Sequence, residues 1–299
     1  MGKIIWHYFC RNTKPGVDKY LKYLMISLDS LINIGQVNPK DIYITLDIPD
    51  NFTSIYLDKI LSYNTNIRQA PEYKNHFKIN TLYSILKENP DIDRAVQIDV
   101  DTLITDPDII HKISNLEGAV NHTTIGWSPA KTIETRDGCR HPTWGAEHIP
   151  GTARDHSRNL LFSLARENPS NAQRYECFKH FMNIAFDFDL ESALDSLKNE
   201  KRMLIGYAVI FSPKLIPESY WKFVATLDLF FCDDEEILIL GELYSGLKYS
   251  DVNIREKIIH GASSTDDFKK LKGIIHFPPK DEEIKEHMDG MADIILNRK

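Results

Sequence analysis

Val96-Gln97-Ile98-Asp99-Val100-Asp101-Thr102-Leu103-Ile104 is the segment from which the architecture follows most directly. An apolar run of strand character is followed by two carboxylates two residues apart, with a second apolar run behind them. Side chains at positions i and i+2 of an extended segment point the same way, so Asp99 and Asp101 can face one ion. Hard divalent cations prefer oxygen ligands and bridge to phosphate oxygens. The segment therefore predicts a site for a cation and a phosphate group at the end of a strand.

Strands and helices alternate in the part of the chain that precedes these carboxylates. Short apolar runs predict strands at residues 4–9, 41–46, 66–69 and 94–98. Apolar side chains at three- and four-residue spacing predict helices at residues 17–34, 53–63 and 77–87. This order is typical of a parallel sheet with helices on both faces. Open sheets of this kind bind ligands at the carboxyl ends of their strands, which is where the two carboxylates stand.

The second half of the chain is less regular. Residues 121–159 are rich in Gly, Pro, Thr, His and Arg and predict a long loop or insertion. Apolar periodicity predicts helices at residues 159–166, 171–186, 190–200, 219–226 and 233–247. Further strands are expected at residues 203–211 and 274–277. The predicted fold class is α/β, a Rossmann-like, mixed but mainly parallel sheet flanked by helices, in a single domain with an elaborated second half.

Composition excludes several classes of protein. With 299 residues, 42% hydrophobic and 26% charged, the chain is neither disordered nor a disulfide scaffold. Its net charge of −7 argues against nucleic acid as the main partner. Four scattered cysteines are expected to be free thiols. No apolar stretch is long enough to span a membrane and no targeting signal is evident, so we expect a cytoplasmic protein without a transmembrane segment.

Three motifs give the chain a resemblance to a known family. They are Asp99-Val100-Asp101, Asp234-Glu235-Glu236-Ile237-Leu238, and Ile274-Ile275-His276-Phe277-Pro278-Pro279-Lys280. Together they resemble the GT-A glycosyltransferases, and within them the retaining family of glycogenin and the bacterial lipooligosaccharide galactosyltransferases, glycosyltransferase family 8. The resemblance covers roughly residues 1–110 and 203–280. It implies a GT-A domain at residues 1–280, followed by a C-terminal helix or tail at 281–299.

The resemblance also divides that domain and assigns a metal site. Residues 1–110 correspond to the half that binds the nucleotide sugar, and residues 111–280 to the acceptor half, with an insertion at 121–201. Asp99, Asp101 and His276 are implied as metal ligands. Two carboxylates and a neutral imidazole are a reasonable ligand set for Mn²⁺ or for Mg²⁺.

The remaining implied roles concern the donor and the reaction centre. Lys280 corresponds to a lysine that contacts the diphosphate, and Lys78 to a basic residue aimed at the donor phosphate or sugar. Asp234 and Glu235 correspond to residues that contact the donor sugar at the reaction centre in members of the family. The base of the donor nucleotide is expected to lie over the end of the first strand, where we expect the ring of Tyr8 to stack on it. Asp47, after the second strand, can reach the nucleoside.

The activity implied is metal-dependent transfer of a sugar from a nucleoside-diphosphate sugar, expected to be a UDP-sugar, to a glycan or other hydroxyl acceptor with retention. Two alternatives stay open. Asp99-Val100-Asp101-Thr102-Leu103 is also similar to the nucleophile motif of haloacid-dehalogenase-like phosphohydrolases, although their Thr stands one place later and their motif lies on the first strand. A non-catalytic module that binds nucleotide sugars or glycans would need no reaction centre.

Overall fold

The computed structural model describes residues 2–11, 18–49, 51–70, 78–126, 171–190, 192–193, 202–228, 234–252, 257–261, 270–277, 288 and 290. The strands of the main sheet are β1 (Lys3–Arg11), β2 (Ile42–Asp47), β3 (Asn66–Gln69), β4 (Ile92–Ile98), β6 (Val120–Gly126), β7 (Arg202–Phe211) and β8 (Ser250–Asp251). A smaller sheet contains β5 (Thr102–Ile104), β9 (Ile259–Gly261) and β10 (Ile274–His276). The helices are α1 (Lys19–Asn33), α2 (Ile55–Ser62), α3 (Lys78–Glu88), α4 (Ile109–Ser114), α8 (Asn171–Phe186), α10 (Glu218–Leu227) and α11 (Asp234–Ser245), with short 3₁₀ helices η1 (Pro39–Asp41) and η2 (Pro213–Leu215).

The main sheet has the strand order β3-β2-β1-β4-β7-β6-β8. Strands β3, β2, β1 and β4 are parallel, and β7 is antiparallel to both of its neighbours, β4 and β6. In the smaller sheet, β10 lies between β5 and β9, antiparallel to β5 and parallel to β9. The predicted mixed, mainly parallel sheet flanked by helices is confirmed.

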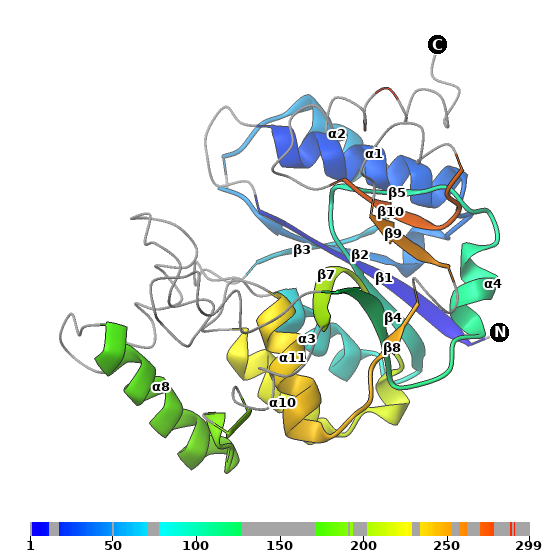
Figure 1. Ribbon diagram of the computed structural model, residues 1–299. Coiled ribbons are helices and arrows are strands. Elements are labelled where there is room, and N and C mark those ends of the chain that lie inside the picture. Colours follow the sequence, from blue (N-terminus) through cyan, green and yellow to red (C-terminus); the bar gives the residue numbers. More distant parts are fainter. Residues whose placement is uncertain are drawn as a thin grey trace.

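Two hydrophobic cores lie on the two faces of the main sheet, because side chains alternate along each strand. On β1, Trp6 and Tyr8 belong to the core beneath α1 and α2, whereas Ile5 belongs to the core against α3, α10 and α11. Figure 1 shows these two groups of helices on opposite sides of the sheet, with the smaller sheet beside α1. Both faces are therefore covered, as parallel strands require.

The first half was predicted closely, and the second half contains elements that were not. Residues 121–126 form most of β6, which pairs with β7, so the predicted loop and insertion begin too early. Helix α4 was not predicted. Helices α8, α10 and α11 and strands β7 and β10 are confirmed. The helix predicted at 159–166 and most of that at 190–200 lie outside the described residues.

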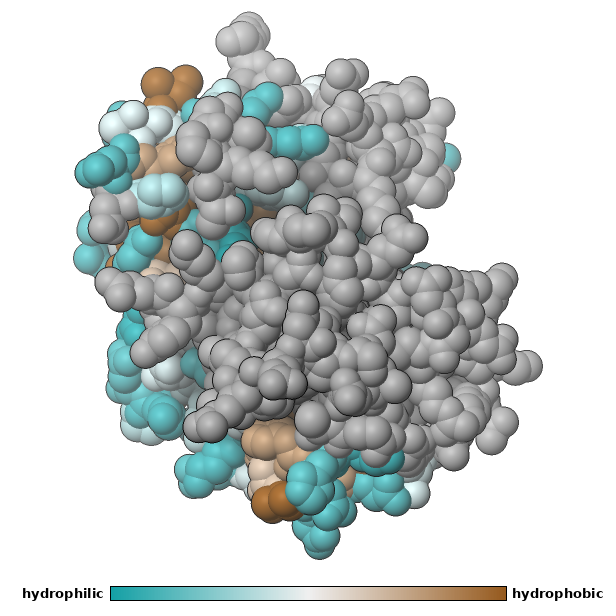
Figure 2. Space-filling view, turned by 90° about the vertical axis from the view of Figure 1, so that its left-hand side faces the viewer, coloured by the Kyte–Doolittle hydropathy of each residue, from teal (hydrophilic) through white to brown (hydrophobic). Residues whose placement is uncertain are grey.

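The surface and the thiols add little to the functional assignment. On the coloured part of the face in Figure 2, hydrophobic residues gather in small separate groups among hydrophilic ones, which is usual for a protein surface. Among the helices of the described segments, none is both long and apolar enough to cross a membrane. Cys10 is a buried free thiol, as predicted; Cys139 and Cys232 lie outside the described residues.

Candidate metal and nucleotide site

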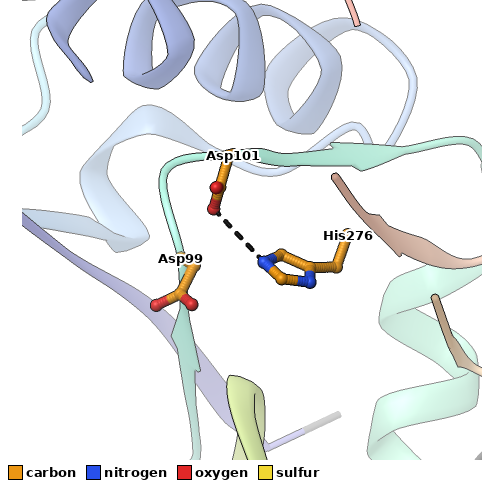
Figure 3. Close-up of side chains that lie close together, drawn as sticks. All are labelled: Asp99, Asp101 and His276. Carbon is orange, nitrogen blue, oxygen red and sulfur yellow. Dashed lines mark ion pairs between the residues drawn. The ribbon is translucent and has the colours of Figure 1, made fainter. Parts of the chain in front are cut away.

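Three side chains from two distant parts of the sequence converge at the carboxyl end of β4. Asp99 and Asp101 lie on the turn between β4 and β5, and His276 ends β10 (Figure 3). One ligand atom from each of the three lies within 4.8 Å of the others. The Nε2 atom of His276 is 3.5 Å from Oδ1 of Asp101, and both side chains are largely buried. This donor set and spacing fit a divalent cation such as Mn²⁺ or Mg²⁺.

The smaller sheet brings the histidine to the carboxylates. His276 is paired with Thr102, the first residue of β5, and the N–H of Phe277 donates to the carbonyl of Asp101 at 2.9 Å. Gly273 precedes β10 with a φ of +147°, and a Cβ there would come within 2.1 Å of the carbonyl oxygen of Ile258. Only glycine tolerates both that conformation and that approach. Backbone pairing at both ends of β10 therefore helps to set the position of His276 relative to the carboxylate turn.

A buried lysine adjoins this cluster. Lys78 is 5% exposed and forms an ion pair with the carboxylate of Asp99. It opens α3, whose first turn is held by the second half of the chain: the N–H of Asn80 donates to Oδ2 of Asp228 at 2.8 Å, and the Asn80 side chain donates to the carbonyl of Ala225. The Asp228 side chain is fully buried. A positive charge beside the carboxylates suits the phosphates of a nucleotide.

The neighbouring strands place another charged pair at the same edge of the sheet. Arg11 ends β1 and Asp47 ends β2; the two residues are in register, and Arg11 Nε is 2.8 Å from Asp47 Oδ2. Both side chains are about one-fifth exposed. Asp47 therefore lies where the nucleoside is expected, but it already has a cationic partner.

The stacking role predicted for Tyr8 does not fit the structure. Tyr8 is 0% exposed, and its hydroxyl lies 2.9 Å from Ser27 Oγ in the core beneath α1. A ring without an exposed face cannot stack on a base. The prediction was wrong because alternation along a strand reveals which residues share a face, not whether that face is covered.

His7, Gln97 and Thr45 form a buried polar trio. His7 lies on the face of β1 opposite to Tyr8, which is the face that packs against α3. His7 Nδ1 lies 2.6 Å from the side-chain oxygen of Gln97, and Nε2 lies 2.9 Å from the hydroxyl of Thr45. Since the amide oxygen only accepts, Nδ1 carries the proton and Nε2 accepts from Thr45. The pKa of His7 is lowered from 6.5 to about 4, mainly by burial and in smaller part by the charges of Lys78 and Arg68, against the hydrogen bond to Gln97, which raises it. The imidazole is therefore neutral near pH 7.

This lowered pKa predicts a loss of stability in acid. Between pH 6.5 and about 4, the unfolded chain binds a proton at His7 that the folded protein does not, so the free energy of unfolding falls as the pH is lowered. The loss reaches roughly 3 kcal/mol, at about 1.36 kcal/mol per pKa unit. Urea unfolding from pH 7 to pH 4.5 should show a shallower pH slope for His7→Gln than for the wild type. Equal slopes would contradict this.

The side chains of the two predicted catalytic residues and of one predicted phosphate contact lie outside the described part of the structure. Asp234 and Glu235 open α11, as predicted, but only their backbone is described. Helix α11 packs against β7 and α10. Lys280 lies outside the described residues. Their roles remain predictions.

The sequence interpretation missed the residues that support the carboxylate turn. Thr102, Ser27 and Ser30 are buried and bonded to one another or to this turn. Ser27 and Ser30 interrupt the apolar face of α1, between Leu24 and Leu31. A hydroxyl on such a face indicates a specific partner, because an unbonded one is costly to bury.

Comparison with known proteins returned structural matches only. No protein-family model and no curated protein matches the chain, whereas 149 chains of solved structures do. The glycosyltransferase GlyE of Streptococcus pneumoniae TIGR4 has a TM-score of 0.46 and 10% identity, over 99% of this chain and 63% of that one. The galactosyltransferase LgtC, in complex with donor and acceptor sugar analogs, has a TM-score of 0.44 and 10% identity, over 98% and 95%.

The core-mannan synthase CmsA/Ktr4 of Aspergillus fumigatus, in a Mn/GDP form, has a TM-score of 0.39 and 11% identity, over 84% of this chain and 71% of that one. A cytidylyltransferase from Leptospira borgpetersenii is also among the matched structures. At TM-scores below 0.5, these likenesses assign no function to the chain.

Proposed function

We propose that this chain is a glycosyltransferase that moves a sugar from a nucleoside-diphosphate sugar, most simply a UDP-sugar, to a hydroxyl of a glycan or other acceptor. The observation that carries the proposal is the convergence of Asp99, Asp101 and His276 at the carboxyl edge of the sheet, beside the buried ammonium of Lys78. Carboxylate oxygens suit a cation that bridges to a phosphorylated ligand, an imidazole suits a transition metal such as Mn²⁺, and the positive charge suits the phosphates. Parallel strands of an α/β sheet present such ligands at this edge.

The reaction exchanges one bond for another at the anomeric carbon. The acceptor oxygen bonds to that carbon, the bond from the carbon to the diphosphate breaks, and its electron pair leaves with the diphosphate. The acceptor proton passes to the departing phosphate oxygen, so no protein base is required, and the product retains its configuration. A divalent cation, when bound, offsets the negative charge of the diphosphate.

The protein's own residues hold the reactants. Lys78 places a positive charge beside the leaving phosphate, and electrostatic stabilisation there is worth most in a site shielded from water. Asp234 and Glu235 are assigned to the sugar, and Lys280 to the diphosphate. Residues 1–110 are assigned to the donor half and 111–280 to the acceptor half, with 281–299 outside the catalytic domain.

Calorimetry on the full chain tests the proposal. UDP, GDP, CDP and ADP, and then their sugars, are titrated with Mn²⁺ or Mg²⁺ and again with a chelator. One nucleoside diphosphate and its sugar should bind at least about tenfold more tightly with the cation. The bound donor should then release its diphosphate when acceptor glycans are added. Lack of nucleotide binding with either ion would overturn the proposal, and binding without transfer to any acceptor would leave only a binding module.

A further inference from the structure

Three buried hydroxyls connect β1, α1 and β5 directly behind the carboxylate turn. The Tyr8 hydroxyl lies 2.9 Å from Ser27 Oγ, and Ser27 Oγ lies 3.2 Å from Thr102 Oγ1. Thr102 Oγ1 donates to the carbonyl of Asp99 at 2.7 Å and so closes the turn that carries both carboxylates. Tyr8, Ser27 and Thr102 are each 0% exposed, so water does not compete for these bonds.

The direction of this hydroxyl chain follows from its last member. A carbonyl only accepts, so the single hydrogen of Thr102 is used on Asp99, and Thr102 must accept from Ser27. Ser27 has then used its own hydrogen and accepts from Tyr8. Burial raises the pKa of Tyr8, which keeps the phenol protonated and able to donate. One arrangement of hydrogens therefore satisfies all three hydroxyls, and it points toward the metal-binding turn.

A second serine of α1 holds the strand that follows the turn. Ser30 Oγ accepts from the N–H of Ile104 at 3.0 Å and donates to the carbonyl of Ser27 at 2.7 Å. On the other side of the turn, the N–H of Phe277 donates to the carbonyl of Asp101. The backbone carbonyls of both carboxylate residues are thus bonded before any ion arrives.

We propose that Ser27, Ser30 and Thr102 are positioning residues that hold Asp99 and Asp101 in the geometry of the bound cation. This inference rests on the proposed function, in that the cluster of Asp99, Asp101 and His276 must bind a metal. Since the turn is ordered in advance, the cation does not have to order it, and the affinity rises accordingly. Partners behind metal ligands are typically worth 10–100-fold in affinity.

A purely structural role would also explain why hydroxyls are buried between α1 and β5, so the test compares metal affinity with stability. Thr102→Val keeps the shape of the side chain but removes the donor to Asp99, whereas Thr102→Ser keeps that donor. Ser212→Ala is the matched control, since Ser212 is fully buried and donates to the carbonyl of Gly118 at 2.7 Å, beside the amino-terminal part of β4. The control removes an equivalent bond far from the carboxylates.

Mn²⁺ affinity is measured by calorimetry and by paramagnetic resonance of the free ion, with thermal unfolding in parallel. Thr102→Val should weaken Mn²⁺ binding by about 10–100-fold, while Thr102→Ser and Ser212→Ala stay within about threefold of the wild type. Ser212→Ala should still lower the unfolding temperature. Unchanged affinity in Thr102→Val, or an equal loss in Ser212→Ala, would overturn the inference.

Two further outcomes are distinguishable. If Thr102→Val does not fold, Ser27→Ala provides the test, because it removes the donor to Thr102 and leaves the turn's own side chains in place. Mn²⁺ affinity should then fall by about tenfold, and an unchanged value would overturn the inference. If the wild-type protein binds no Mn²⁺, the metal site fails together with the inference, whereas a failure confined to the variants leaves the proposed function standing.

Discussion

Asp101→Asn should bind Mn²⁺ and a nucleoside diphosphate at least about 100-fold more weakly than the wild type. Loss of a direct metal ligand should lower the metal affinity at least as much as loss of a residue that supports a ligand, which typically costs up to about 100-fold. Asp101 is the most buried of the three proposed metal ligands, at 5% exposure. Asparagine keeps its shape but removes the negative charge that faces His276 and the neighbouring carboxylate. Calorimetry with and without Mn²⁺ gives both affinities.

Stability separates this effect from misfolding. Without metal, Asp101→Asn should unfold at the wild-type temperature or above it, since one of two adjacent carboxylates has been neutralised. At Mn²⁺ concentrations of 100 times the wild-type dissociation constant, the wild type gains about 2.7 kcal/mol and the variant gains no more than about 0.4 kcal/mol. Asp108→Asn, an exposed acid before α4 whose side chain caps no helix, is the control and should behave as the wild type. Normal Mn²⁺ binding by Asp101→Asn would contradict the assignment.

Lys78→Met should weaken binding of the donor without weakening binding of the metal. Mn²⁺ affinity should stay within about threefold or increase, because the ammonium paired with Asp99 no longer competes with the cation. Affinity for the nucleotide sugar should fall by about 10–100-fold, the effect of losing one hydrogen bond between charged groups at about 1.5–3 kcal/mol. Both constants come from the same calorimetric titration, first with metal and then with donor.

The matched control for that change lies on the same helix. Lys87 is exposed in the last turn of α3, and its ammonium lies 4.8 Å from the centre of the Tyr83 ring. Lys87→Met should leave both affinities at the wild-type level. Equal losses of donor affinity in the two variants would mean that Lys78 acts only through the general charge of the protein.

The sequence predicted the parts of the site that depend on local pattern. Alternating apolar runs located β1 to β4, and the position of Asp99 and Asp101 after a buried strand indicated the functional edge of the sheet. His276 came from a motif resemblance, and the structure brings it to the carboxylates. These features depend on short segments whose periodicity is strong.

The features that the sequence did not reveal depend on long-range packing. The burial of Tyr8 depends on α1, which covers that face of β1, and nothing in the strand itself specifies it. The capping of α3 by Asp228 joins residues 148 positions apart. Strand β6 consists largely of polar residues and forms beside β7, so its sequence resembles a loop. Pairing partners of this kind are set by the whole fold rather than by local propensity.

The pairing of β10 with β5 determines when, during synthesis of the chain, the third residue of the cluster can join the two carboxylates. The two carboxylates leave the ribosome with the first half of the chain, whereas His276 emerges near its end. A nascent chain can therefore form the parallel strands and the carboxylate turn while lacking the third ligand. The proposed metal site is completed only after β10 has entered between β5 and β9, so we expect full metal binding only in chains whose synthesis has passed residue 276.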